Sequence, residues 1–290
     1  MRDPRLLACN GRVAALELQG KVKAERFVKG WPQQVSGSLG NLCSAPAGAL
    51  QRQLYPGEQL TVYEEQAGWS FIKARAHGYV GYIKSQQLQS SNQAPNTHYI
   101  SVPISHSYAQ SNVKSGATAL LVMGSQLQTL QEETGFVNTQ FGWVPKQHVK
   151  ALTDPLPDPV AVAEQLLGAP YLWGGDSALG IDCSGLIRLS QMICGHNCPG
   201  DSDLQQRALG VVLPPDAQLQ RGDFVFWKGH VALMVSEETL IHANAHGMSV
   251  TYEALSDAVT RIALAGEGDI VVKKRLVFSR CICEPANLSG

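Results

Sequence analysis

The sequence predicts an α+β protein in which two small all-β modules precede a domain of mixed helices and strands. Three observations predict this class. Short β-type runs separated by Pro-Gly and Gly turns extend to about residue 88, and a related pattern follows before residue 150. After the proline-rich stretch 154–159, helical periodicity is followed by strands. Since 290 residues exceed the usual size of one domain, several folded units are expected.

Residues 1–30 form a lead-in segment that carries charges of both signs. The stretch 13–27 is modestly amphipathic, which favours a lead-in segment or a short helix packed on a later domain, and no motif assigns it a role. Charged side chains also interrupt these 30 residues, so they contain no uninterrupted apolar core that would direct export. We therefore expect a cytoplasmic protein.

The first β module is expected over residues 31–92. Residues 60–63, 69–72 and 79–83 combine β-branched and aromatic side chains, and turn signals separate them. Such short strands at close spacing are typical of a small all-β barrel.

The second β module is expected over residues 93–153, because the sequence pattern of the first recurs there. The run GWSFI at 68–72 is echoed by GFVN at 135–138, and GYIK at 81–84 is echoed by GWVP at 142–145. Two related modules therefore stand in tandem.

A third domain, residues 154–290, begins at the proline-rich stretch, because prolines resist both helix interiors and central strands. Asp158 can cap a helix that has Pro159 in its first position and residues 160–167 as its body. Gly168 stands where a left-handed terminating residue is needed.

A second helix is predicted from residue 184 to about residue 194, with Gly195 as its stop. Leu186, Leu189 and Ile193 lie on one side of it, which predicts a buried helix. Cys183 stands at the head of this helix. Since unpaired N–H groups and the helix dipole favour negative charge there, we expect a lowered thiol pKa and a nucleophilic thiolate.

Strands rather than further long helices are expected after this point, at residues 224–227, 231–235, 240–243 and 271–278. If residues 236–238 form the turn between the second and third of these strands, His230 faces Asn244. His242 is then its diagonal neighbour on the same face, about 7 to 8 Å away, within reach of an imidazole pair.

Composition excludes several classes of function. Lysines and arginines number 23 against 24 acidic residues, which argues against a nucleic-acid or membrane-surface partner and favours a small one. No apolar run approaches the roughly 18 residues of a membrane-spanning helix, so membrane insertion is not expected. The seven cysteines are odd in number and suggest no disulfide framework, in keeping with a reduced compartment.

Most cysteines and histidines are interpreted as structural. Cys194, His196 and Cys198 lack a fourth zinc ligand at suitable spacing, so neither a metal nor a cofactor is predicted. Cys281 and Cys283 have a poor spacing for a redox pair or a metal clip. The remaining structural interpretations cover Cys9, Cys43, His77, His98, His106, His148 and His246.

Five segments in order closely resemble the successive signatures of the NlpC/P60 cysteine peptidases: YLWGG at 171–175, GIDCSG at 180–185, RGDFVFW at 221–227, GHVA at 229–232 and IHA at 241–243. The resemblance covers about residues 155–280 and implies a papain-like α+β catalytic domain. The tandem β modules look like the bacterial SH3 domains found ahead of that domain. The family pattern is that of the γ-D-glutamyl-L-diamino acid endopeptidases, which trim murein peptides.

The resemblance implies a catalytic role for four residues. Cys183 is the nucleophile, His230 takes its proton, and His242 orients His230 through a ring hydrogen bond. The backbone N–H of Cys183 and the side chain of Tyr171 are the expected oxyanion donors, although Tyr171 also fits a packed aromatic.

Three further residues match family positions that contact substrate. Asp182 and Ser184 flank the nucleophile and resemble positions that contact the α-carboxylate or amine side of the D-glutamyl ligand. Ser202 matches a substrate-contacting serine, but the family often has an arginine nearby, where this chain has Gly200. Residues 201–203 fit a helix cap equally well.

The first β module is expected to contribute an amine-binding pair by the same resemblance. In related recycling enzymes an acid and a tyrosine of this module bind the free amine of an N-terminal L-alanine. Glu58 resembles the acid and Tyr79 the tyrosine, with Tyr82 as the alternative; the structural interpretation is a turn residue and a barrel aromatic. A carboxylate facing an ammonium would reject intact stems, in which this amine is acylated.

The expected function is cleavage of the γ-D-glutamyl–diamino acid bond in murein peptides such as L-Ala-γ-D-Glu-diaminopimelate, during cell-wall recycling. One alternative is an amidase or acyltransferase that uses the same Cys-His-His site. Another is a non-catalytic wall-binding protein, against which the intact Cys183, His230 and His242 argue. No motif indicates the number of subunits, a preference between diaminopimelate and lysine, or a choice between free peptide and intact wall.

Overall fold

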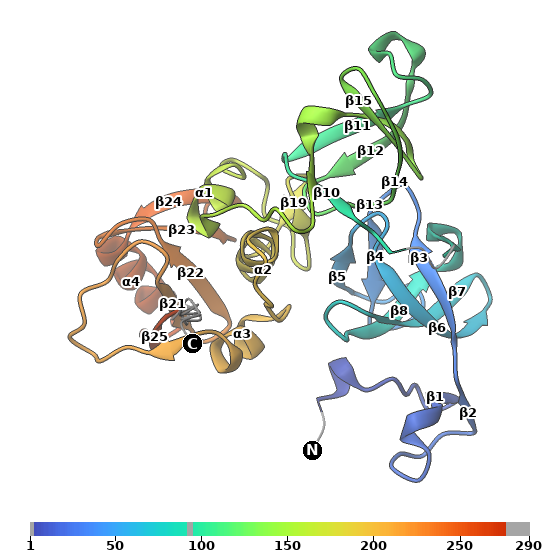
Figure 1. Cartoon of the computed structure of the whole chain (residues 1–290). Coiled ribbons are helices and arrows are strands. Elements are labelled where there is room, and N and C mark those ends of the chain that lie inside the picture. Colours follow the sequence, from blue (N-terminus) through green and yellow to red (C-terminus); the bar gives the residue numbers. More distant parts are fainter. Residues whose placement is uncertain (1–2, 92–94, 277–290) are drawn as a thin grey trace, which may run out of the picture.

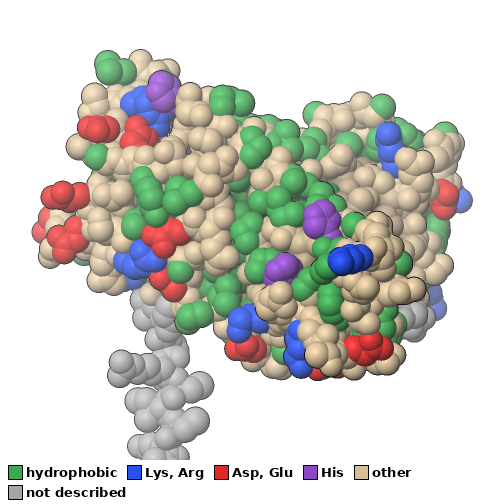
Figure 2. Space-filling model, turned by 90° about the horizontal axis from the view of Figure 1, so that it is seen from above, with side chains coloured by type: hydrophobic (Ala, Val, Ile, Leu, Met, Phe, Trp, Pro, Cys, Tyr) green, Lys and Arg blue, Asp and Glu red, His purple; other side chains and the backbone are tan. Residues whose placement is uncertain are grey.

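The computed structural model describes residues 3–91 and 95–276, arranged as a short N-terminal segment, two β modules and an α+β domain (Figure 1). Cys281 and Cys283 lie outside the described residues. In the space-filling view of one face, positive and negative side chains are interspersed (Figure 2). No helix within the two described ranges is long and apolar enough to cross a membrane.

The first β module is a seven-stranded antiparallel sheet with the strand order β5-β4-β8-β7-β6-β3-β9. Alternate side chains of these strands, such as Leu60 and Val62 of β6, point inward to a small core. The elements are β3 (Trp31–Val35), β4 (Gly40–Cys43), β5 (Leu50–Leu54), β6 (Gln59–Gln66), β7 (Trp69–Ala74), β8 (Val80–Lys84), η3 (Ser85–Gln87) and β9 (Leu88–Ser90).

The second β module has one three-stranded sheet, β13-β10-β17, and one five-stranded sheet, β12-β11-β16-β15-β14, all antiparallel. Ile100, Leu121, Leu127 and Val144 form its core. The elements are β10 (His98–Ile100), β11 (Ile104–Tyr108), η4 (Val113–Ser115), β12 (Ala117–Val122), β13 (Gln126–Leu127), β14 (Thr129–Glu133), β15 (Phe136–Thr139), β16 (Gly142–Pro145), η5 (Lys146–His148) and β17 (Val149–Ala151).

The N-terminal segment contains no α-helix over residues 13–27, so the helical interpretation of this stretch is wrong. Its elements are η1 (Pro4–Leu6), β1 (Val13–Ala15), η2 (Leu16–Leu18) and β2 (Arg26–Val28), with β1 and β2 paired in parallel. All three residues of β1 are buried, and they share a core with Tyr63, Phe71 and Val80 of the first module. A helix would bury only a stripe of this stretch, whereas the extended chain buries both of its faces.

The α+β domain is a six-stranded antiparallel sheet, β20-β25-β21-β22-β23-β24, with helices on both faces. The elements are α1 (Pro159–Glu164), β18 (Asp176–Ser177), β19 (Gly180–Ile181), α2 (Cys183–Ile193), α3 (Ser202–Ala208), β20 (Val211–Val212), β21 (Phe224–Trp227), β22 (His230–Met234), β23 (Thr239–Asn244), β24 (Ser249–Ala254), α4 (Leu255–Leu264) and β25 (Val272–Arg275).

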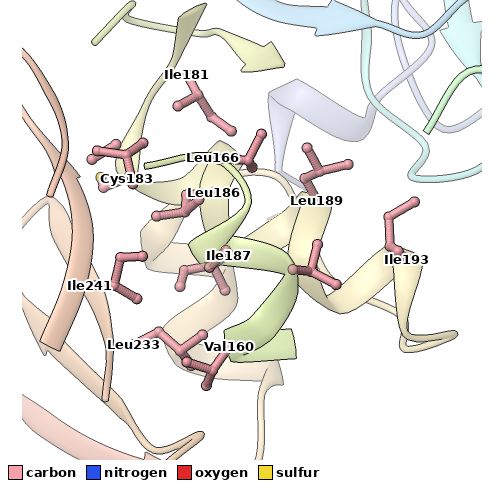
Figure 3. Packing of buried hydrophobic residues seen from close by; sticks show 14 of the residues in the cluster. Val160, Leu166, Ile181, Cys183, Leu186, Ile187, Leu189, Ile193, Leu233 and Ile241 are labelled. Carbon is pink, nitrogen blue, oxygen red and sulfur yellow. The ribbon is translucent and has the colours of Figure 1, made fainter. Parts of the chain in front are cut away.

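The two faces of this sheet pack against different helices, which explains why its strands read as continuous apolar runs. Leu233 and Ile241 join Leu186 and Ile187 of α2 (Figure 3), whereas Leu240 packs with residues of α4. Strand β24 and helix α4 were not expected, because the sequence predicted strands without another long helix. Residues 277–278 of the last expected strand lie outside the described residues.

The predicted cap of α1 is confirmed, and α2 has a cap that was not predicted. Asp158 accepts a hydrogen bond from the backbone N of Val160 at 2.9 Å, and Asp182 accepts one from the backbone N of Gly185 at 2.7 Å. Gly168 and Gly195, the predicted terminators, both have φ +80°.

The first β module packs directly against the head of α2. Tyr55 donates from its hydroxyl to the backbone oxygen of Asp176 at 3.0 Å, and the backbone N of Gln53 donates to the backbone oxygen of Gly174 at 2.9 Å. Tyr55 is fully buried in the same hydrophobic cluster as Leu186. The module is therefore a structural wall of the region around Cys183.

Candidate active site

Cys183 is the first residue of α2, directly after the capping residue Asp182. Its side chain is 7% exposed, and its sulfur lies 4.0 Å from the backbone oxygen of Gly229. The thiol therefore stands at a helix N-terminus and beside the turn that leads into β22.

His230 and His242 are hydrogen-bonded to each other, His230 Nε2 to His242 Nδ1, at 2.9 Å. The pairs Leu233–Ile241 and Met234–Leu240 have the register that, extended along both strands, places His230 opposite Asn244, as expected from the sequence. His230 begins β22 and is half-buried, while His242 on β23 is fully buried. Because Nε2 of His230 is occupied, Nδ1 is the ring nitrogen left for the thiol.

Sequence reasoning missed Glu253 and Arg261 near His242 and gave Asn244 only as the residue opposite His230. His242 Nε2 lies 3.0 Å from Glu253 Oε2 and 2.9 Å from Asn244 Nδ2. Arg261 of α4 binds both oxygens of Glu253, at 2.9 and 2.7 Å. Only the expected register pointed to Asn244, and no signal pointed to the other two because β24 and α4 were not predicted.

The protonation of the resting site differs from the expectation. Burial raises the pKa of the Cys183 thiol to about 12, and the neighbouring Asp182 adds to this effect. Burial also lowers the pKa of His230 to about 3 and that of His242 to about 4. The expected lowering of the thiol pKa is therefore wrong for the unliganded site: desolvation outweighs the helix terminus, and thiol and imidazole are both neutral.

Two cavities meet at Cys183. The barrel-side cavity, of about 440 Å³, lies toward the first β module and is lined by Arg5, Tyr79, Asp182, Ser184, Asp201, Ser202 and Asp203, among others. The sheet-side cavity, of about 420 Å³, is lined by Lys228, His230, Asn244, His246, Arg261 and Glu267, among others. Tyr171, Trp173 and Cys183 line both, so the thiol is reachable from either side.

Tyr171 lies beside the thiol, as the resemblance implied. It lines both cavities, and burial raises the pKa of its hydroxyl. Its role as an oxyanion donor stays a prediction.

The residues beside the nucleophile form a closed set of hydrogen bonds. Asp182 Oδ1 accepts from the Ser184 hydroxyl at 2.8 Å, and Asp182 Oδ2 accepts from the backbone N of Gly174 at 2.8 Å. Ser202 is the first residue of α3 and lines the barrel-side cavity. Asp201 precedes α3, but its side chain makes no capping hydrogen bond. Residues 201–203 all line the barrel-side cavity, so a helix cap does not account for their side chains.

Glu58 does not reach the cleft, and the expectation that it binds the substrate amine is contradicted. Its side chain is 1% exposed, lies 3.0 Å from His77 Nε2 and accepts a hydrogen bond from the backbone N of Tyr55 at 3.1 Å. The turn at Pro56 and Gly57 directs the carboxylate into the module, where His77 lowers its pKa against the effect of burial.

Tyr79 does reach the barrel-side cavity. Its hydroxyl donates to Asp201 Oδ2 at 2.7 Å and accepts from the backbone N of Asp201 at 3.0 Å. Tyr82, the alternative, packs on Phe71 with ring centroids 5.3 Å apart and does not line that cavity.

Arg52 occupies the space beside Gly200, where the family often has an arginine. A Cβ added at Gly200 would lie 2.4 Å from Arg52 Cζ. The buried Arg52 binds Asp176 Oδ2 at 2.8 Å and Asp201 Oδ1 at 3.3 Å, and its guanidinium lies 5.0 Å from the centre of the Tyr79 ring. The first β module therefore supplies a buried guanidinium that binds Asp201 from behind the cavity wall.

A second guanidinium comes from the N-terminal segment. Arg5 binds Asp201 at 2.7 Å, Asp203 at 2.8 Å and Asp3 at 2.6 Å. Residues 3–28 thus help to close the barrel-side cavity, a role that no sequence motif suggested. Among the residues that the structure describes, no group of three or more His, Cys, Asp or Glu is placed to hold a metal ion.

The buried histidine pair predicts an acid-sensitive fold. Because the folded pKa of His242, about 4, lies below the ordinary 6.5, unfolding takes up a proton between these values. The free energy of unfolding should therefore decrease as the pH is lowered, and this residue should contribute about 2 kcal/mol of that decrease between pH 7 and pH 5. Urea unfolding at both pH values measures this. His242→Gln should show a smaller loss than the native protein, and an equal loss in both would contradict the prediction.

An α+β domain with a cysteine at a helix head and a histidine pair on the adjacent sheet defines the chain as a cysteine peptidase. Comparison with known families agrees. The model of the NlpC/P60 family matches residues 168–266, and that of the bacterial dipeptidyl-peptidase Sh3 domain matches residues 42–88. The chain contains an NlpC/P60 peptidase domain preceded by a bacterial SH3 domain.

Curated relatives span most of the chain. A gamma-D-glutamyl-L-lysine dipeptidyl-peptidase of Bacillus subtilis is 28% identical over 72% of this chain and 77% of its own length. Dipeptidyl-peptidase 6 of Lysinibacillus sphaericus is 25% identical over 76% of this chain and 90% of its own. A crystal structure of an NlpC/P60 family protein from Bacillus cereus shares the fold, with a TM-score of 0.74 at 20% identity, over 86% of this chain and all of that one.

Proposed function

We propose that this protein hydrolyses the γ-D-glutamyl–diamino acid bond of murein-derived peptides that carry a free N-terminal L-alanine. The observation that carries the proposal is the barrel-side cavity, which is lined by residues of the first β module and by Arg5 of the N-terminal segment, and not by His230. Three carboxylates, Asp182, Asp201 and Asp203, line it against the single guanidinium of Arg5. A short peptide with an ammonium end suits such an acid-lined space.

The curated relatives support the same bond. The Bacillus subtilis relative is named for cleavage at γ-D-glutamyl-L-lysine, and a Bacillus cereus relative with the same name is 28% identical over 68% of this chain. A dipeptidyl-peptidase removes two residues from an amino terminus, so its substrate site must end about two residues before the nucleophile. We assign that part of the substrate to the barrel-side cavity, which lies beside Cys183 and is not lined by His230.

The chemistry follows from the order of the groups. His230 Nδ1 takes the thiol proton as Cys183 Sγ attacks the γ-carbonyl carbon, and the backbone N–H of Cys183 with Tyr171 holds the oxyanion. His230 then protonates the departing amine. Because His230 lines only the sheet-side cavity, the diamino acid leaves on that side and the L-Ala-D-Glu part lies on the barrel side. Water releases the acyl group from Cys183.

We assign the amine to Asp201 in place of Glu58. Asp201 lines the cavity, and Tyr79, Arg52 and Arg5 hold its carboxylate. Asp182 and Ser184 then contact the D-glutamyl part, with Ser202 beside them. A requirement for a free amine suits peptides already released from the wall, so we propose a role in cytoplasmic recycling.

The test compares L-Ala-γ-D-Glu-meso-diaminopimelate with its N-acetylated form, and each with the corresponding lysine peptide, with products identified by mass. We expect release of the diamino acid from the free-amine peptides alone, with kcat/KM for the acetylated forms lower by about 100-fold or more, because an acetylated nitrogen carries no positive charge for Asp201 to bind. Equal cleavage of both forms would contradict the amine-reading role. Cleavage at another bond would favour the amidase or acyltransferase alternative.

A further inference from the structure

The hydrogen-bond chain that starts at the nucleophile does not end at His242. His242 Nε2 is 3.0 Å from Glu253 Oε2, and Arg261 binds the same carboxylate through two N–H groups. Glu253 comes from β24, where it lies opposite Leu240 and therefore on the sheet face of His242, the face that α4 covers. Arg261 reaches it from α4. The side chain of His242 is fully buried, so these neighbours replace water as its hydrogen-bond partners.

The position of the proton on His242 decides whether His230 can act as a base. For His230 Nδ1 to accept the thiol proton, the proton of neutral His230 must sit on Nε2, which donates to His242 Nδ1. His242 must then carry its own proton on Nε2, and that N–H needs an acceptor. The opposite arrangement places a proton on His230 Nδ1 and removes the base.

Two groups compete for His242 Nε2 with opposite demands. Asn244 points its NH₂ at this nitrogen from 2.9 Å, since its oxygen accepts a hydrogen bond from the backbone N of Gly247 at 2.6 Å. The amide can donate only to a bare Nε2, which is the unproductive tautomer. Glu253, at 3.0 Å, can only accept a hydrogen bond when it is ionised. It therefore requires a proton on His242 Nε2, which is the productive tautomer.

The charge on Glu253 favours the productive arrangement. Arg261 holds the pKa of Glu253 below its usual range, so the carboxylate is ionised at neutral pH. A hydrogen bond to an ionised acceptor is roughly twice as strong as a neutral one, and a bare ring nitrogen facing a carboxylate is repelled. Glu253 should therefore prevail over Asn244.

We propose that Glu253 is a positioning residue of the peptidase, whose carboxylate, held by Arg261, sets the tautomer of the His230–His242 pair so that His230 presents a bare Nδ1 to Cys183. The inference rests on the cysteine-peptidase chemistry and not on the identity of the peptide cleaved.

The first readout is independent of substrate. In protein labelled with ¹⁵N-histidine, ring nitrogen shifts report which nitrogen carries the proton. We expect His242 protonated on Nε2 in the native protein and on Nδ1 in Glu253→Ala. Glu253→Met keeps much of the volume without a strong acceptor and gives a folded comparison if the alanine variant unfolds. The proposal would be overturned, whatever the activity, if native protein carries the proton on His242 Nδ1. It would also be overturned if native protein and every folded Glu253 variant have the same tautomer.

The second readout is kinetic and uses L-Ala-γ-D-Glu-meso-diaminopimelate. Glu253→Ala should lower kcat by about 100- to 1,000-fold with little change in KM, because a wrong tautomer removes the base and leaves the binding cavity intact. In the double variant Glu253→Ala/Asn244→Asp the carboxylate returns on the other side of His242, and kcat should recover at least about tenfold. Failure of the double variant to recover while folded, or a kcat unchanged in Glu253→Ala, would overturn the proposal.

The matched control is Glu164→Ala, which breaks an exposed ion pair with Arg221 in the same domain, 3.0 Å long in the native protein. Its kcat should stay within about twofold of the native value. If no variant and no native protein cleaves the peptide, the proposed substrate is wrong, and the histidine tautomers still decide the role of Glu253.

Discussion

Replacing Cys183 by alanine should lower kcat by about 10⁶-fold and leave the fold unchanged, since removal of the nucleophile in a comparable peptidase triad has a loss of this size. The side chain is small and only 7% exposed, so alanine leaves at most a small void at the head of α2. The measurement is the initial rate of diamino acid release from L-Ala-γ-D-Glu-meso-diaminopimelate, with the melting temperature of both proteins recorded.

Cys194→Ala is the matched control for this experiment. Cys194 lies just after the last turn of α2, and its side chain is also 7% exposed. It is far from both cavities that meet at Cys183, so we expect nearly native activity. Turnover retained by Cys183→Ala would refute its assignment as the nucleophile, and equal loss in both variants would indicate damage to the helix.

Replacing Arg52 by alanine should destabilise the protein by about 3 kcal/mol. The change leaves the fully buried carboxylate of Asp176 without its 2.8 Å partner, and breaking a buried ion pair costs several kcal/mol because the remaining charge stays desolvated. Arg188, 3.5 Å from the same carboxylate, offsets part of this loss. The free energy of unfolding from urea titration measures the effect, and KM should rise because Asp201 loses a partner.

Arg221→Ala provides the contrast, because Arg221 makes ion pairs of 2.8 and 3.0 Å with Asp158 and Glu164 at the surface. Its side chain is 40% exposed, so its loss should cost at most about 1 kcal/mol. Equal destabilisation by both variants would mean that burial of the Arg52–Asp176 pair is not what stabilises the contact between the first module and the catalytic domain.

Local sequence signals predicted the architecture and the central histidine pair. The capping residues act on backbone that is adjacent in sequence, so their effects can be predicted without knowledge of the fold. Asp158 accepts a hydrogen bond from a backbone N–H two residues on, and Gly168 and Gly195 adopt left-handed φ angles. The pairing of His230 with His242 followed from strand alternation and a short turn, which are also local. The option of a short helix at residues 13–27 was wrong because burial against the first module, not periodicity, selects the conformation of this stretch.

The rest of the site depends on segments far apart in the chain. Glu58 points inward because His77 offers it a partner there, and Arg52 fills the space beside Gly200 although about 150 residues separate them. Glu253 contacts His242 from the neighbouring strand β24, and no local pattern in the sequence indicated this strand. The raised pKa of Cys183 has the same origin: a helix terminus is visible in sequence, whereas desolvation is the sum of everything packed around the thiol. Residue types and spacing thus specified which groups could react, and packing set their charge states and partners.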